Sequence, residues 1–191
     1  MTVVMMRAWS ALVGAVLVLG ALSGGAAYES ASPRSADWPR SVDWREIAWP
    51  FPRDGWPAGR AFRCGIAACG DDIEVYVRPK IGFCNCDRGV ADDDEVDRVA
   101  DLDLISEHFV PLRDGDVVHV ADMPGRIRAY DLTMPNGAQH AAIGIAVSRR
   151  CDLLVAVARG RGEAVGVQRV ALEFLRSTEM KRWMTAAMDG R

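Results

Sequence analysis

The stretch HAAIGIAVSRRCDLLVAVARG, residues 140–160, decides the fold class of this protein. It contains two runs, 140–148 and 152–160, in which apolar side chains occupy both alternating sets of positions. Successive side chains of a strand point to opposite faces of a sheet, so both faces of these strands should be buried. We therefore expect two central strands, with helix covering one face of the sheet.

More strands are expected upstream of this stretch. In the segment IEVYVRPKI, residues 73–81, apolar side chains alternate with polar or charged ones, which predicts a strand with one solvated face. Pro79 lacks a backbone donor and places this segment at an edge or at a strand end. Further strands should begin at Val117 and Gly125, and the sequence PNGA, residues 135–138, is typical of a hairpin turn before the stretch quoted above.

Downstream, the period changes from that of a strand to that of a helix. In VGVQRVALEFLRS, residues 165–177, apolar side chains recur at helical spacing, and they do so again after a break near Ser177, which is suited to cap a second helix. Strands followed by helices indicate an α+β fold. We expect a single domain with a mostly antiparallel sheet, a C-terminal helix packed on one face, and an extended Trp/Pro-rich N-terminal arm.

Residues 37–60 form that arm. Proline fixes φ and removes backbone donors, which excludes a regular helix or a central strand from WPFPRDGWP, residues 49–57. The rings of such an arm commonly cover a core, but tryptophan also offers a large rigid contact area to a ligand. The candidate binding surface comprises Trp44, Trp49 and Trp56.

The N-terminus, residues 1–27, has the layout of a secretory signal peptide. The basic Arg7 precedes an uncharged apolar run, and small residues precede the expected cleavage site after Ala27. The alternative is an uncleaved membrane anchor, because a membrane span requires about 20 apolar residues. We expect a periplasmic or secreted bacterial protein, with a flexible linker over 28–36 and the α+β domain over 61–191.

The charge balance restricts the partners of the processed protein. Without Arg7, 22 basic residues stand against 26 acidic ones, a formal net charge of −4. Nucleic-acid binding needs a basic face, and no cluster of Lys or Arg suited to anionic lipid is visible. We expect an unknown protein or a small ligand in the periplasm as the partner, no nucleic acid, and a membrane only if the signal segment is uncleaved.

Five cysteines follow the signal segment: Cys64, Cys69, Cys84, Cys86 and Cys151. Thiols pair in an oxidising compartment, so two disulfides and one remaining cysteine are expected. A bridge between Cys84 and Cys86 would be strained, which favours bridges from the 64/69 pair to the 84/86 pair and leaves Cys151 as a free thiol. The alternatives are that Cys151 displaces one of the four, that the four bind zinc, or that the CNC motif is a redox site.

An acidic run occupies residues 92–103. Carboxylates are ligands for a hard cation such as calcium. The candidate ligands are Asp92, Asp93, Asp94 and Asp97. The run lacks the glycine of an EF-hand loop, and the favoured interpretation is a helix with Asp92 or Asp93 as its N-cap. In that helix, Arg98 should pair with Asp94 or Asp101, one turn away.

The sequence contains no recognisable catalytic motif. A cysteine hydrolase would require His108 or His140 to lie beside Cys151 and a carboxylate, and no local signature indicates this. We expect no catalysis and no cofactor, with calcium or zinc as the ions to test.

Two resemblances add to this interpretation. The segments WPFPRDGWPAGRAFRC (49–64) and RPKIGFCNCDRGVADDDEVDRVADLDL (78–104) resemble a family of uncharacterised exported proteins of alphaproteobacteria, which implies export and one domain and no particular activity. The element order of roughly the last 80 residues resembles the PsbP-like α/β/α sandwich. The sequence thus predicts an exported binding or assembly protein stabilised by disulfides. The alternatives are a metal-binding protein that uses the acidic run and a thiol redox accessory that uses CNC.

Overall fold

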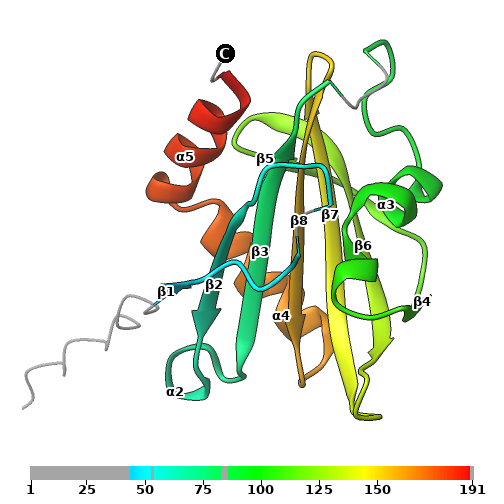
Figure 1. Ribbon diagram of the computed structural model, residues 1–191, viewed down its shortest axis with the longest axis vertical. Coiled ribbons are helices and arrows are strands. Elements are labelled where there is room, and N and C mark those ends of the chain that lie inside the picture. Colours follow the sequence, from blue (N-terminus) through cyan, green and yellow to red (C-terminus); the bar gives the residue numbers. More distant parts are fainter. Residues whose placement is uncertain (1–43, 53, 83–85, 190–191) are drawn as a thin grey trace, which may run out of the picture. The chain divides into compact units, whose positions relative to one another are not determined.

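An eight-stranded antiparallel sheet forms the centre of the computed structural model, which describes residues 44–52, 54–82 and 86–189 (Figure 1). The strands follow the order β1-β2-β3-β8-β7-β6-β4, and β5 also pairs with β6. Their bounds are β1 (Arg45–Ile47), β2 (Arg60–Cys64), β3 (Ile73–Lys80), β4 (His108–Pro111), β5 (Asp116–Val120), β6 (Met123–Thr133), β7 (Gln139–Arg149) and β8 (Asp152–Gly160). The expected α+β fold with a mostly antiparallel sheet is confirmed.

The strands β7 and β8 lie in the middle of the sheet, as the stretch 140–160 predicts. They pair with each other from Ala141 opposite Gly160 to Arg149 opposite Asp152. Every residue of β8 except Arg159 is buried. The predicted hairpin turn joins β6 to β7, and it contains a glycine in the left-handed conformation that such turns require.

Two C-terminal helices, α4 (Ala164–Leu175) and α5 (Thr178–Asp189), cover one face of the sheet (orange to red in Figure 1). Ser177 separates them, and its Oγ accepts a hydrogen bond from the backbone N–H of Met180 at 3.3 Å, which caps α5 as predicted. Buried side chains of both helices pack against the sheet in one large apolar core. The predicted helical cover on this face is confirmed.

The opposite face is covered by α3 (Asp93–Val99), by the 3-10 turn η1 (Leu102–Leu104) and by the N-terminal arm (Figure 1). The helix α3 packs directly over Gly144 of β7. A Cβ atom at position 144 would lie 3.0 Å from Cβ of Ala100 and 3.1 Å from Cε2 of Tyr130. A larger residue there would push α3 away, so this glycine sets the distance between helix and sheet.

The arm also covers the part of β3 that the sequence predicts to be solvated. Tyr76, Arg78 and Lys80 are only 6%, 1% and 6% exposed. Trp49 of the arm contacts Tyr76, with 6.2 Å between the ring centroids. The prediction of a solvated face on β3 is therefore wrong. Alternation describes the strand itself and does not show that a segment distant in sequence packs over it.

The tryptophans of the arm lie on both faces of the sheet. Trp44 stacks on Phe174 of α4 with 4.2 Å between centroids, whereas Trp49 lies over β3 on the opposite face. Between them, β1 pairs with β2 and attaches the arm to the sheet. Residues 1–43, which include the predicted signal peptide, the linker and the first part of the arm, lie outside the described residues. Among the described helices, none is both long and apolar enough to cross a membrane.

Candidate functional site

Two disulfides are present in the described part of the chain. Cys64 pairs with Cys69 of the short helix α2 (Ile66–Cys69), and Cys86 pairs with Cys151. The predicted bridges between the 64/69 pair and the 84/86 pair are therefore wrong, and Cys151 is not a free thiol. Cys84 lies outside the described residues.

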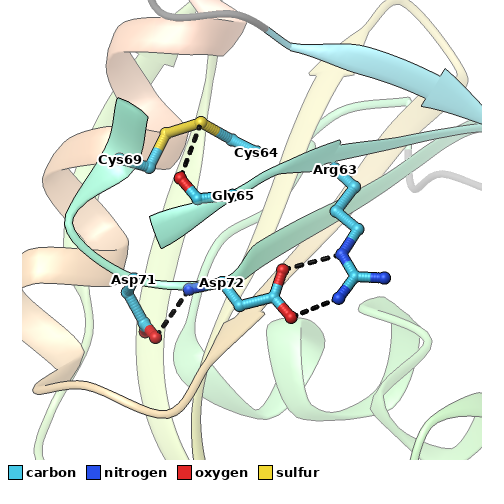
Figure 2. The surroundings of a disulfide bond; sticks show 6 residues. All are labelled: Arg63, Cys64, Gly65, Cys69, Asp71 and Asp72. Atoms are coloured by element: carbon cyan, nitrogen blue, oxygen red, sulfur yellow. Dashed lines mark hydrogen bonds and ion pairs between the residues drawn. A yellow bond between two sulfur atoms is a disulfide. The ribbon is translucent and has the colours of Figure 1, made fainter. Parts of the chain in front are cut away.

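The register of the sheet explains this pairing. Cys64 lies opposite Ile73, at the start of β3, so the chain has to cross the whole length of β3 before it reaches Cys86. At the far end of β3, Lys80 lies opposite Leu153, which places the β7–β8 turn with Cys151 beside the segment that follows β3. Figure 2 shows the other bridge, closed within a few residues beside the ion pair of Arg63 with Asp72.

A cavity of about 630 Å³ opens beside the Cys86–Cys151 bridge, and we call it the rim cavity. Its walls come from the turn after β3, the β5–β6 turn, the end of β7 with the β7–β8 turn, and α5. The lining residues are Cys86, Asp87, Arg88, Gly89, Ala121, Asp122, Met123, Pro124, Ser148, Arg149, Arg150 and Thr185. The disulfide joins two of these four walls.

Left-handed backbone conformations concentrate at the rim cavity. In the described residues, four non-glycine positions have positive φ, and three of them line this cavity: Ala121 (50°), Asp122 (62°) and Arg150 (59°). Each such position costs roughly 1–2 kcal/mol relative to ordinary backbone. Gly89 also has positive φ, and a Cβ atom there would collide with Oγ of Ser148. Ala121 and Asp122 form the two-residue loop of the β5–β6 hairpin, and Arg150 begins that of the β7–β8 hairpin. Positive φ is the backbone geometry that such tight turns require.

Two of the three arginines that line the rim cavity form no ion pair within the described residues. Arg149 donates to Asp189 at 3.1 Å. Arg88 and Arg150 are exposed and form no ion pair or hydrogen bond within the described residues. The cavity therefore presents two guanidinium groups whose donors are available to a ligand.

The second notable cluster is an ion network under the arm, in which Arg78 and Lys80 are buried and Asp54 of the arm is partly exposed. Arg78 donates two hydrogen bonds to Asp101, both at 2.7 Å, and two to Asp54, at 2.9 and 2.6 Å. Lys80 Nζ donates to Asp101 at 2.6 Å and to the carbonyl oxygen of Val99 at 2.9 Å. Two cations thus face two carboxylates, and the described residues contain no buried side-chain nitrogen or oxygen without a partner.

Aromatic rings of the arm complete this network. The guanidinium carbon of Arg78 lies 5.7 Å from the ring centroid of Trp49, and Lys80 Nζ lies 5.9 Å from that of Trp56. Both distances suit cation–π attraction. The network joins the arm, β3 and the turn after α3, so its role is to hold these three segments together. The sequence gives little indication of this network. Its one trace is that Arg78 and Lys80 occupy positions of the strand that alternate with apolar ones.

The network predicts acid sensitivity through Asp54. Hydrogen bonds from Arg78 lower the pKa of Asp54 from 3.8 to about 2, against the opposing effect of burial. A lowered pKa in the folded state gives stability that is present above pH 4 and is lost as the pH falls toward 2. We expect the stability difference between the wild-type protein and Asp54→Asn, measured by urea unfolding between pH 2 and 6, to shrink over that interval. A difference that stays constant would contradict this assignment.

The acidic run forms the predicted helix start and several ion pairs. The side chain of Asp92 accepts a hydrogen bond from the backbone N–H of Glu95 at 3.0 Å, which confirms the N-cap. Arg98 pairs with Glu95 and not with Asp94 or Asp101, so the predicted partners are wrong. Asp101 has a left-handed backbone and turns toward β3 instead.

Two of the other candidate metal ligands, Asp93 and Asp97, are engaged by arginines, and Asp94 is exposed in the first turn of α3. Asp93 accepts from Arg126 at 2.6 Å and from the backbone N–H of Gly115 at 2.8 Å, and these contacts, the backbone bond foremost, lower its pKa. Asp97 accepts from Arg128 at 2.7 Å and from the hydroxyl of Tyr130 at 2.6 Å. In the ranges that the structure describes, no three His, Cys, Asp or Glu side chains group as a metal site would require.

His108 and His140 lie away from Cys151. His140 lies at the start of β7, which runs the length of the sheet before it reaches the turn with Cys151. The ring Nδ1 of His140 lies 3.3 Å from Nη1 of Arg159, whose Nη2 donates to Glu74 at 2.5 Å. Burial, followed by the charge of Arg159, lowers the pKa of His140. His108 lies on β4 opposite Thr133. Neither histidine joins Cys151 in one site.

Comparisons with known proteins give no family for this chain. No protein-family model matches it, and no curated protein matches it. Among solved structures, a Pseudomonas aeruginosa protein of unknown function, PA94, is similar over 74% of this chain and 85% of its own, with 12% sequence identity and a TM-score of 0.36. A similarity this low assigns no function to this chain.

Proposed function

We propose that this chain is an exported periplasmic binding protein that holds a small ligand in the rim cavity and performs no catalysis itself. Two disulfides suggest a compartment outside the reducing cytoplasm. The predicted signal peptide over residues 1–27 supports export to the periplasm.

The rim cavity is the observation that carries the binding role. Its volume of about 630 Å³ lies within the usual range for small-ligand sites, roughly 300–1,000 Å³. Its walls come from four segments that are distant in sequence, and a disulfide fixes two of them. Rigid walls reduce the entropy that binding has to offset. The tryptophans of the arm, in contrast, are half-buried and pack on the domain, which makes them a less suitable ligand platform.

Filling the cavity tests this proposal. Thr185 lines the cavity from α5, and its neighbour Ala186 is exposed on the same helix, so Thr185→Trp and Ala186→Trp form a matched pair. Melting temperatures would be measured with succinate, inorganic phosphate, glucose and spermidine as probes. We expect at least one probe to raise the melting temperature of the wild type and of Ala186→Trp by about 5 °C at roughly 100 times its Kd, and to have no effect on Thr185→Trp.

Two results would overturn the proposal. One is that no probe stabilises the wild-type protein. The other is that Thr185→Trp, with a melting temperature near that of the wild type in the absence of probe, responds to the probes just as the wild type does.

A further inference from the structure

We propose that the rim cavity binds a small oxyanion, a carboxylate or a phosphate, and that the guanidinium groups of Arg88 and Arg150 hold it. This inference rests on the proposed function, because it assigns a ligand class to the same cavity. Three arginines and two aspartates line the cavity, and Arg149 is already paired with Asp189. The first support for the inference is therefore the presence of two guanidinium groups, those of Arg88 and Arg150, and not an excess of positive charge.

The second support is that the arginines on the described strands are paired, with the exception of the exposed Arg45 of β1. Arg63, Arg78, Arg126, Arg128 and Arg159 each bind a carboxylate of the chain. Arg88 and Arg150 do not, within the described residues, although both line one cavity. Guanidinium groups bind carboxylate and phosphate oxygens through paired charge-assisted hydrogen bonds. The rim cavity is therefore a place where this chain offers such donors to an external anion.

The third support is the way in which the two arginines are attached. Arg150 directly precedes Cys151, and Arg88 lies two residues after Cys86, so a single disulfide links the backbones that carry both side chains. The tight β7–β8 turn holds Arg150, and Gly89 packs so near Ser148 that a Cβ atom at position 89 would collide with Oγ of that serine. The hydroxyl groups of Ser148 and Thr185 add donors at the same cavity. The backbone at both arginines is thus fixed before any anion enters, and their exposed side chains become ordered when the anion binds.

Titration calorimetry tests the assignment. The probes are succinate, inorganic phosphate and the neutral succinamide, which has a shape similar to that of succinate without its charge. We compare the wild-type protein with Arg88→Gln/Arg150→Gln. The matched control is Arg161→Gln/Arg169→Gln, which removes the same charge from two exposed arginines that do not line the cavity.

We expect succinate, phosphate or both to bind the wild type and the control equally well. In Arg88→Gln/Arg150→Gln the Kd should rise roughly tenfold or more, since each hydrogen bond to a charged group contributes at least that much. Binding should also weaken as sodium chloride is raised, because salt screens exposed charges. Which of the two anions binds distinguishes a carboxylate site from a phosphate site.

Failure of this inference can be distinguished from failure of the proposed function. If succinamide binds, and if its binding is blocked by Thr185→Trp and unaffected by the arginine changes, the cavity binds ligands but does not select anions. If the anions bind equally well to Arg88→Gln/Arg150→Gln, these arginines do not hold them. If no probe binds at all, both proposals are wrong. Melting curves and free-thiol counts confirm that each variant is folded with both bridges intact.

Discussion

Replacing Arg78 with methionine should lower the free energy of unfolding by about 3–5 kcal/mol, the cost of removing one partner from a buried ion network. Arg78 is 1% exposed and carries four hydrogen bonds to Asp54 and Asp101. Methionine fills a similar volume and provides no donor. The carboxylate of Asp101, which is 12% exposed, would retain only Lys80 as a counter-charge.

Urea unfolding measures this effect, and Arg63→Met provides the matched control. Arg63 lies on β2, also in a two-bond ion pair with an aspartate, but its side chain is 44% exposed. Exposed ion pairs contribute about 0–1 kcal/mol, so the control should change stability only slightly. Equal losses in the two variants would show that burial does not determine the strength of the Arg78 network. Tryptophan fluorescence should also change in Arg78→Met alone, because Trp49 and Trp56 lie over this network.

Local patterns predicted those parts of the fold that depend on neighbouring residues in the sequence. The apolar runs at 140–148 and 152–160 identified two central strands, because burial on both faces leaves a continuous apolar signal. The acidic first turn predicts a helix N-cap at Asp92 or Asp93, and Asp92 is the cap in the structure. Ser177 was identified from the break between two helical patterns. Each of these features is decided within a few residues of the side chain concerned.

Features that depend on strand register could not be predicted in this way. Arg78 finds its carboxylates 24 residues before and 23 residues after it, and no periodicity connects those positions. The disulfide pairing follows from the fact that β3 carries the chain from Cys64 to the opposite end of the sheet. The rim cavity combines Arg88 with Arg150 for the same reason. Spacing in the sequence does not show which cysteines or arginines share an end of the sheet, and these contacts become visible only when the order of the strands is known.

Removing the Cys86–Cys151 bridge should cost more stability than removing Cys64–Cys69. A disulfide stabilises mainly by restricting the unfolded chain, and the effect grows with the length of the loop that it closes. The two bridges join residues 65 and 5 positions apart, respectively. By the chain-entropy relation, Cys86→Ser/Cys151→Ser should lose about 4 kcal/mol, and Cys64→Ser/Cys69→Ser about 2 kcal/mol.

Urea unfolding of the two double variants under identical conditions measures this difference in stability. Stabilisation of each variant by an added anion gives a second, independent comparison of the two bridges. Without Cys86–Cys151, Arg88 and Arg150 lose the covalent link between the backbones that carry them, so succinate or phosphate should stabilise that variant less than it stabilises the wild type. Without Cys64–Cys69, stabilisation by the same anion should stay at the wild-type level, because neither cysteine lines the rim cavity. If both variants lost equal stability and responded equally to the anion, the long bridge would constrain neither the unfolded chain nor the rim cavity in the way its position requires.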